Sequence, residues 1–354
     1  MNVLYLGHYR ENSSIGYSSK RYIHAINNID YINLSVRPLY LQKNVSSNIP
    51  PHILTCEQNS SDYYDMVIQD TFPEYYEYNG SFGKNICMPK IISRNLQHTG
   101  WIDKINMMDE VWVNSYFAEK SLRESGVDKL IKVIPEPFDL NIETSEKSES
   151  DKEFNFYSIS SLEDKDNLLS LMIAYITEFD KTEGVRLIIK TQECKEEEIK
   201  KLLNRAYGIS KKSSADVNEP VIIVGFVEEE KMQELMNNTD CYIDVSSGSY
   251  STASCVEALI NKKITACVEG TSCSSYISNT NGFIIKGDTR PILSDNKYST
   301  HKISSIYEQY QIPHIDSIRS TMRNAYELTS QEKQSKIDNI NTKIFDHKEF
   351  SRYM

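Results

Sequence analysis

The chain has 354 residues, enough for two ordinary domains, because single hydrophobic cores rarely extend beyond ~250–300 residues. Its hydrophobic content of 39% and charged content of 25% are typical of a globular protein and exclude a largely disordered one. The net charge of −11, without a run of basic residues, disfavours a surface dedicated to duplex DNA.

Neither a targeting segment nor a membrane span is predicted. Residues 1–7 lack the basic and apolar regions of a signal peptide, and no stretch reaches the ~18 apolar residues that cross a bilayer. The seven cysteines are odd in number and form no Cys-x-x-Cys pair, which favours reduced thiols. We therefore expect a cytoplasmic protein with no stable membrane insertion.

Short apolar runs alternate with amphipathic segments along the first 141 residues. The pattern predicts strands at 3–6, 65–69, 85–92, 110–115 and 132–134, and helices around 22–29, at 101–108 and at 116–125. Ser115 is the expected N-cap of the last of these helices, and Gly126 is expected to end it. This alternation is typical of a parallel sheet covered by helices.

A polar segment at 142–152 is the best candidate for a linker, and the alternation restarts after it. Strands are expected at 154–159, 186–190, 221–224, 241–245 and 264–267, with helices at 167–179, 196–207, 229–237 and 253–260. A final helical region is expected from 315 to about 344, and 287–312 is interpreted as loop. We therefore expect an α/β chain of two Rossmann-like domains that face each other across a cleft, with ligands at the carboxyl ends of the strands.

Several segments resemble group 1 glycosyltransferases of GT-B fold, in the order and at the spacing of that family. They are 109–118, 125–127 and 133–139 in the first half, and 224–227, 240–247, 257–258 and 281–285 in the second. The resemblance covers roughly residues 1–345. It implies a retaining transferase that needs no metal and no further cofactor, with a nucleotide-sugar co-substrate, UDP- or GDP-linked. Residues 1–141 would bind the acceptor, 150–335 would bind the donor, and a helix within 336–354 would pack back on the first domain.

The family's donor motif contains two glutamates seven residues apart. The second matches Glu257, which would hydrogen-bond the ribose hydroxyls, whereas the first falls on Ser249 and so lacks a carboxylate. The arginine that holds the diphosphate falls on Ser161, and the lysine falls on Lys165, or on Asp166 if the register shifts by one. These departures leave open an altered donor, a different anchoring of the diphosphate, or a loss of catalysis.

Two lysines and one turn are candidates for binding the diphosphate. Lys165 and Lys190 lie near the carboxyl ends of predicted strands, where charge-assisted hydrogen bonds to phosphate are expected. The segment Gly248–Thr252, with Ser249, Tyr250, Ser251 and Thr252, joins a strand to a helix, so its backbone N–H groups are suited to phosphate and Tyr250 to stacking on a sugar. The alternative is an ordinary strand-to-helix turn.

Further candidates lie in loops at strand ends. Gly16 and Tyr17 follow the first strand, where glycine lets a ligand approach the backbone, or serves only to turn the chain. Arg94 and His98 follow the third strand, and His98 is a candidate general base or sugar ligand, with a surface histidine as the alternative. By the resemblance, Gly225, Phe226 and Val227 would contact the nucleobase.

No metal site is predicted. Asp109, Asp240 and Asp244 lie on different elements without a histidine spaced to join them. Cys241, Cys255 and Cys267 fall on apolar segments and are expected to be core residues.

The sequence thus predicts transfer of a hexose from a nucleotide sugar to a hydroxyl acceptor, which could be a glycan, a small molecule or a modified DNA base. One alternative is a catalytically degenerate nucleotide- or carbohydrate-binding relative, favoured by Ser249, Ser161 and Asp166. A second is a viral-type transferase acting on DNA bases, which the acidic charge disfavours.

Overall fold

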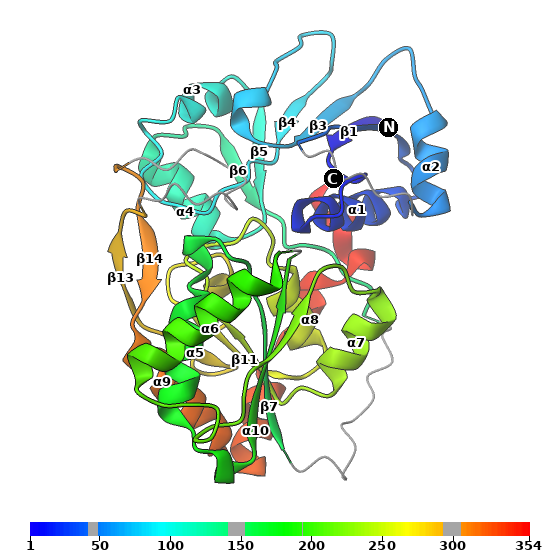
Figure 1. Cartoon of the computed structure of the whole chain (residues 1–354). Helices are drawn as coiled ribbons and strands as arrows, with labels where there is room; N and C mark the ends of the chain where they lie inside the picture. The colour runs from blue at the N-terminus through cyan, green and yellow to red at the C-terminus, as the bar shows by residue number, and fades with distance from the viewer. Residues whose placement is uncertain (42–48, 141–152, 193, 293–305) are drawn as a thin grey trace. The chain divides into compact units, whose positions relative to one another are not determined.

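A computed structural model of the chain describes residues 1–41, 49–140, 153–192, 194–292 and 306–354. The chain divides into two compact units, and Figure 1 labels many of their elements. Unit 1 comprises Met1–Ile142, Ser249–Ala253 and Asn341–Met354, and unit 2 comprises Glu143–Gly248 and Ser254–Ile340. The linker predicted at 142–152 lies outside the described residues.

Unit 1 is built on a six-stranded sheet of order β2-β1-β3-β4-β5-β6, in which all neighbouring strands are parallel. Its strands are β1 (Asn2–Gly7), β2 (Asn33–Pro38), β3 (Met66–Asp70), β4 (Asn85–Cys87), β5 (Glu110–Val113) and β6 (Leu130–Val133). Its helices are α1 (Ser14–Asn27), α2 (Pro51–Gln58), α3 (Trp101–Asn106) and α4 (Tyr116–Ser125). The strand order reverses between β1 and β3, so their carboxyl ends frame a switch point where ligands bind in folds of this type.

The helix ends of unit 1 follow from local sequence. Ser13 accepts a hydrogen bond from the Gly16 N–H group and caps α1. The predicted N-cap Ser115 accepts one from Ala118, and Gly126 ends α4 in the left-handed conformation at φ 106°, so both predictions for this helix are confirmed.

Unit 2 is built on a second six-stranded parallel sheet, of order β12-β11-β10-β7-β8-β9. Its strands are β7 (Phe154–Ile159), β8 (Val185–Thr191), β9 (Val221–Val224), β10 (Cys241–Asp244), β11 (Ile264–Val268) and β12 (Phe283–Ile285). Its helices are α5 (Leu168–Glu178), α6 (Glu196–Ser210), α7 (Glu229–Asn237), α8 (Ala253–Ile260), α9 (Ile315–Tyr326) and α10 (Ser330–Asp338). The order reverses between β7 and β10, which places the switch point of this unit at their carboxyl ends.

Successive residues of β10 face opposite sides of the sheet. Cys241, Ile243 and Val245 belong to the main apolar core, together with residues of α5 and α9. Tyr242 and Asp244 therefore face the other side.

Several sequence predictions were wrong in detail. The strand expected at 85–92 ends at Cys87, while β2 and α2 were not predicted. Within the range expected to be loop, β13 (Gly287–Arg290) pairs with β14 (Tyr310–Pro313) as an antiparallel ribbon. The helix expected from 315 to 344 is interrupted, because Thr329 starts α10 with a capping box that includes Glu332. After α10 the chain forms two 3₁₀ helices, η5 (Thr342–Phe345) and η6 (His347–Tyr353).

Within the ranges that the structure describes, no helix combines the length and the apolar character needed to cross a bilayer.

Candidate functional site

The loops that follow β7 and β10 are joined by hydrogen bonds at the switch point of unit 2. The Ser247 N–H group donates to the Lys165 carbonyl at 2.7 Å. The Asn167 side chain donates to the Val245 carbonyl and to Ser247 Oγ, both at 2.9 Å. Asn167 itself adopts the left-handed conformation at φ 51°, which asparagine tolerates better than most residues. The two loops therefore form one fixed platform at the strand ends.

Lys165 is held inside a cluster of carboxylates on this platform. Its Nζ atom lies 2.7 Å from Asp166 Oδ1 and 3.6 Å from Glu163 Oε2. Burial on its own would lower the pKa of Lys165, but Asp166 and Glu163 raise it above its ordinary value. Burial raises the pKa of Glu163. Lys165 is thus already paired with carboxylates within the chain, and its contact with the diphosphate stays a prediction.

Lys190 provides a cation at the end of the neighbouring strand β8. Its side chain is half-buried, and no carboxylate among the described residues lies within ion-pair distance of it. Burial lowers the pKa of its ammonium group, because a charge without a partner is poorly solvated there. The Lys190 carbonyl accepts the Ser160 N–H group at 3.0 Å, which fixes this lysine beside the loop after β7.

The loop after β9 exposes an aromatic side chain next to an open backbone. Gly225 has φ 88° and donates to the Thr191 carbonyl at 3.1 Å, while no heavy atom lies within 4 Å of the position a Cβ would take. Phe226 is 68% exposed, and Val227 is half-buried. A flat ring could approach this loop without displacing protein atoms.

Glu257 lies on α8 and is half-buried. Burial, followed by the negative charge of Glu257, raises the pKa of Tyr157 on β7. The charge of Glu257 thus acts on a residue of β7, and the ribose contact of Glu257 stays a prediction.

The turn that precedes α8 is held by a buried carboxylate. Ser249–Ala253 belongs to unit 1, where the fully buried carboxylate of Glu136 binds it. Glu136 accepts the Ser251 hydroxyl at 3.0 Å and the Thr252 N–H group at 3.3 Å. It also accepts the Ser18 hydroxyl at 2.9 Å. An internal anion therefore takes the Ser251 hydroxyl and the Thr252 N–H group, to which a phosphate would bind, and the phosphate cradle stays a prediction.

The rest of the turn is also engaged. The Ser249 hydroxyl accepts the Ser251 N–H group at 3.4 Å. The Tyr250 carbonyl accepts the Asn114 side chain at 3.1 Å, and its ring meets Phe72 edge-on with centroids 5.3 Å apart. The sequence analysis includes Glu136 in the segment 133–139 without assigning it a role, although an acidic residue between Pro135 and Pro137 was the available signal.

A second buried carboxylate, missed by sequence reasoning, lies at the switch point of unit 1. Asp70, the last residue of β3, forms an ion pair with Lys90 and accepts hydroxyl groups from Tyr5 at 2.7 Å and Ser19 at 2.5 Å. Next to it, His8 lies 2.9 Å from the Thr71 hydroxyl. The negative charge of Asp70 is therefore balanced by partners within unit 1.

The predicted site residues in the loops of unit 1 lie in different local environments. A Cβ at Gly16 would lie 2.1 Å from the Glu11 carbonyl oxygen, so the space beside this glycine is filled by its own loop and is not open to a ligand. The Tyr17 ring lies under Lys20 Nζ at 4.7 Å, and the Arg94 guanidinium lies over the Phe117 ring at 5.6 Å. His98 lies in an exposed turn.

A pocket of about 500 Å³ in unit 1 is lined by residues that include Asn28, Tyr31 and His347. It lies at the C-terminal end of α1, away from the carboxyl ends of the strands. We assign it no role in the candidate site.

The two parallel six-stranded sheets and their order define the class: the chain has the GT-B fold. HepE from Anabaena, solved with UDP and glucose, aligns with a TM-score of 0.66 at 13% identity, over 100% of this chain and 98% of HepE. The N-terminal domain of trehalose-6-phosphate phosphatase from Candida albicans aligns with a TM-score of 0.64 at 9% identity, over 99% and 95%. The UDP-forming α,α-trehalose-phosphate synthase of Burkholderia xenovorans aligns with a TM-score of 0.60 at 8% identity, over 82% and 71%. No family model and no curated protein matches the sequence.

Proposed function

We propose that the protein is a glycosyltransferase that moves a sugar, a hexose, from a nucleoside diphosphate sugar to a hydroxyl acceptor. The GT-B fold supports this proposal, as do the similar structures of HepE, which were solved with UDP and with UDP-glucose. We expect UDP-linked donors first and GDP-linked donors second. Residues 150–335 are proposed to bind the donor and residues 1–141 the acceptor.

The observation that carries the proposal is the environment of Lys190. A half-buried ammonium without a carboxylate partner among the described residues is unfavourable unless an anion binds it. A diphosphate at the carboxyl end of β8 would supply that anion and form charge-assisted hydrogen bonds. Gly225 and Phe226 would then receive the base, and Glu257 the ribose.

We propose transfer with retention at the anomeric carbon and without a metal ion in the reaction. Catalysis would come from positioning the two substrates and from stabilising the departing diphosphate. Lys190 is the proposed source of that stabilisation, since Lys165 is neutralised by Asp166 and Glu163. The departing phosphate would accept the acceptor proton, and His98 stays a candidate for a hydrogen bond to the sugar.

Ligand binding tests the donor site directly. UDP, GDP, ADP and their common sugar conjugates are compared by thermal shift and calorimetry on the wild type and on Lys190→Met, Glu257→Ala and the control Lys200→Met. Lys200 is 67% exposed and pairs with Glu196 along its own helix. Losing one charge-assisted contact should weaken binding of one nucleotide about 10- to 100-fold in Lys190→Met. Equal affinity in Lys190→Met and Lys200→Met would refute the assignment of Lys190.

A non-catalytic nucleotide-binding protein is the second candidate. It is favoured by Ser249 in place of the family's glutamate and by Glu136 at the turn before α8. Release of the nucleoside diphosphate from the bound sugar conjugate is measured with a panel of hydroxyl acceptors. Tight binding with no acceptor-dependent release would support this candidate over the transferase.

A further inference from the structure

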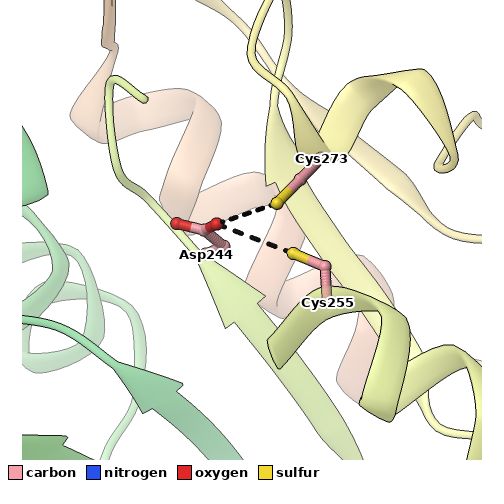
Figure 2. A group of neighbouring side chains, drawn as sticks. All are labelled: Asp244, Cys255 and Cys273. Carbon is pink, nitrogen blue, oxygen red and sulfur yellow. Dashed lines mark hydrogen bonds between the residues drawn. The ribbon is translucent and has the colours of Figure 1, made fainter. Parts of the chain in front are cut away.

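Three potential metal ligands from separate elements meet at one point of unit 2. Asp244 ends β10, Cys255 lies on α8, and Cys273 starts the 3₁₀ helix η4 (Cys273–Ser275). Figure 2 shows both thiols directed at the Asp244 carboxylate. Cys273 Sγ lies 3.3 Å and Cys255 Sγ 3.6 Å from Asp244 Oδ2, and all three side chains are buried.

The fold explains why these residues converge. Asp244 faces away from the main apolar core, because its neighbours Ile243 and Val245 belong to that core. Cys267 of β11 is its register partner and so lies on the same face of the sheet. The side that faces α8 therefore carries a carboxylate and thiols where aliphatic side chains are usual in a buried parallel sheet.

The spacing of the three groups fits a tetrahedral metal ion. Zinc binds sulfur at about 2.3 Å and carboxylate oxygen at about 2.0–2.2 Å, so tetrahedral geometry separates a sulfur from an oxygen ligand by about 3.5–3.7 Å. The separation of 3.6 Å from Cys255 lies within this range, and that of 3.3 Å from Cys273 is slightly shorter. The sulfur and oxygen atoms of the group all lie within 4.8 Å of one another.

We propose that Asp244, Cys255 and Cys273 form a three-ligand site for a thiophilic divalent cation, with Zn²⁺ as its ion and a water in the fourth position. Without metal, both thiols donate their protons to the carboxylate. Binding one hydrated Zn²⁺ breaks two S–H bonds, forms two Zn–S bonds and one bond to Asp244, keeps one water in the fourth position, and releases two protons to solvent. The charge of the cluster is unchanged by this exchange, which avoids the cost of adding net charge to a buried site.

The site would fasten α8 and η4 to the end of β10. The Ser246 N–H group donates to the other carboxylate oxygen, Asp244 Oδ1, at 2.8 Å, so Asp244 also holds the start of the loop at the switch point. The proposal rests on the convergence of these three side chains and does not depend on the proposed function.

The test is a Co²⁺ titration of the full reduced chain, followed by displacement with Zn²⁺. We expect one equivalent of Co²⁺ to give the sulfur-to-cobalt charge-transfer band and the intense visible bands of a tetrahedral thiolate site. Cys255→Ser and Cys273→Ser should each lose this spectrum, and Asp244→Asn should weaken binding at least 10-fold. Cys87→Ser is the matched control, since Cys87 is a buried cysteine of β4 in unit 1.

The wild-type spectrum alone can overturn the proposal, whether or not a variant folds. Absence of a thiolate charge-transfer band in the wild type, or an unchanged band in folded Cys255→Ser or Cys273→Ser, rules the site out. A rise in melting temperature with Zn²⁺ that is seen in the wild type and in Cys87→Ser but is lost in Asp244→Asn supports it. An equal rise in all three contradicts it.

Discussion

Three side chains donate to the buried carboxylate of Glu110. Lys84 forms an ion pair with it, Lys132 Nζ lies 2.8 Å away, and the Trp112 indole donates to it at 2.6 Å. Burial works against the charged form, yet Lys132, Lys84 and Trp112 together lower the pKa of Glu110 below its ordinary value of 4.5. The ionised form is therefore stabilised by folding.

Replacing Glu110 by glutamine should destabilise unit 1 by about 1–3 kcal/mol at pH 7, because two ammonium groups and an indole lose a charged acceptor. Because folding lowers the pKa of Glu110, its contribution to stability is fully present above pH 4.5. It is lost as the pH falls through the pKa of the folded state. The difference in unfolding free energy between wild type and variant should therefore shrink below pH 4.5. Glu124→Gln, at an exposed pair on α4, is the control and should show no such trend.

Two glycines in helices should respond to alanine in opposite directions. At Gly16 the new Cβ meets the Glu11 carbonyl oxygen at 2.1 Å, so Gly16→Ala should cost about 1–3 kcal/mol of overpacking. At Gly208, within α6, no heavy atom lies within 4 Å of the Cβ position, so Gly208→Ala should gain about 0.5–1 kcal/mol from helix propensity. Urea unfolding measures the change in unfolding free energy of both variants. A Gly16→Ala variant as stable as the wild type would contradict the close packing of Gly16 against Glu11.

At the scale of elements, Arg323 joins α9 to the end of α5. Its guanidinium donates to Glu178 Oε1 at 2.8 Å, to the Glu178 carbonyl at 2.9 Å and to Glu183 Oε1 at 2.5 Å. The same group lies over the Phe179 ring at 4.7 Å. Because the planar fork serves several acceptors at once, a lysine cannot replace it.

We expect Arg323→Lys to destabilise unit 2 by about 1–3 kcal/mol through the lost hydrogen bonds and stacking. Arg319 provides the comparison on the same helix, since it reaches Glu178 through one longer contact of 3.2 Å and is more exposed. Arg319→Lys should change stability by less than about 1 kcal/mol. Similar losses in the two variants would show that the network at Arg323 has no special role.

The alternation of apolar runs was sufficient to predict the α/β class, and the GT-B fold is confirmed. The apolar pattern failed to predict β2, which carries Asn33 and Arg37 and ends at Pro38, because an edge strand needs no continuous apolar run.

Contacts between residues far apart in sequence could not be predicted. Glu136 binds Ser251 and Thr252 across more than 100 residues, and Cys255 and Cys273 show no ligand spacing. The roles of the predicted donor residues stay predictions.

At the scale of the whole molecule, each unit has its own hydrophobic core. One core includes Phe156, Leu171 and Ile243 of unit 2, and the other includes Tyr5, Ile68 and Phe350 of unit 1. Calorimetry should therefore resolve two unfolding transitions. Glu110→Gln should lower the melting temperature of one transition, and Arg323→Lys that of the other. A single transition that both variants shift equally would contradict independent cores.

The last residues of the chain complete the unit that contains the first ones. Phe350 is buried against Tyr22 with ring centroids 6.0 Å apart, and the Phe138 N–H group donates to the Phe345 carbonyl at 2.7 Å. Domains generally fold in the order in which the ribosome releases them. Here the N-terminal sheet emerges first but cannot close its core until residues 341–354 have emerged, whereas most of unit 2 is synthesised before them. The unit that is synthesised first is therefore the last to be finished, and a nascent chain stalled before residue 341 would expose the site that Phe350 fills.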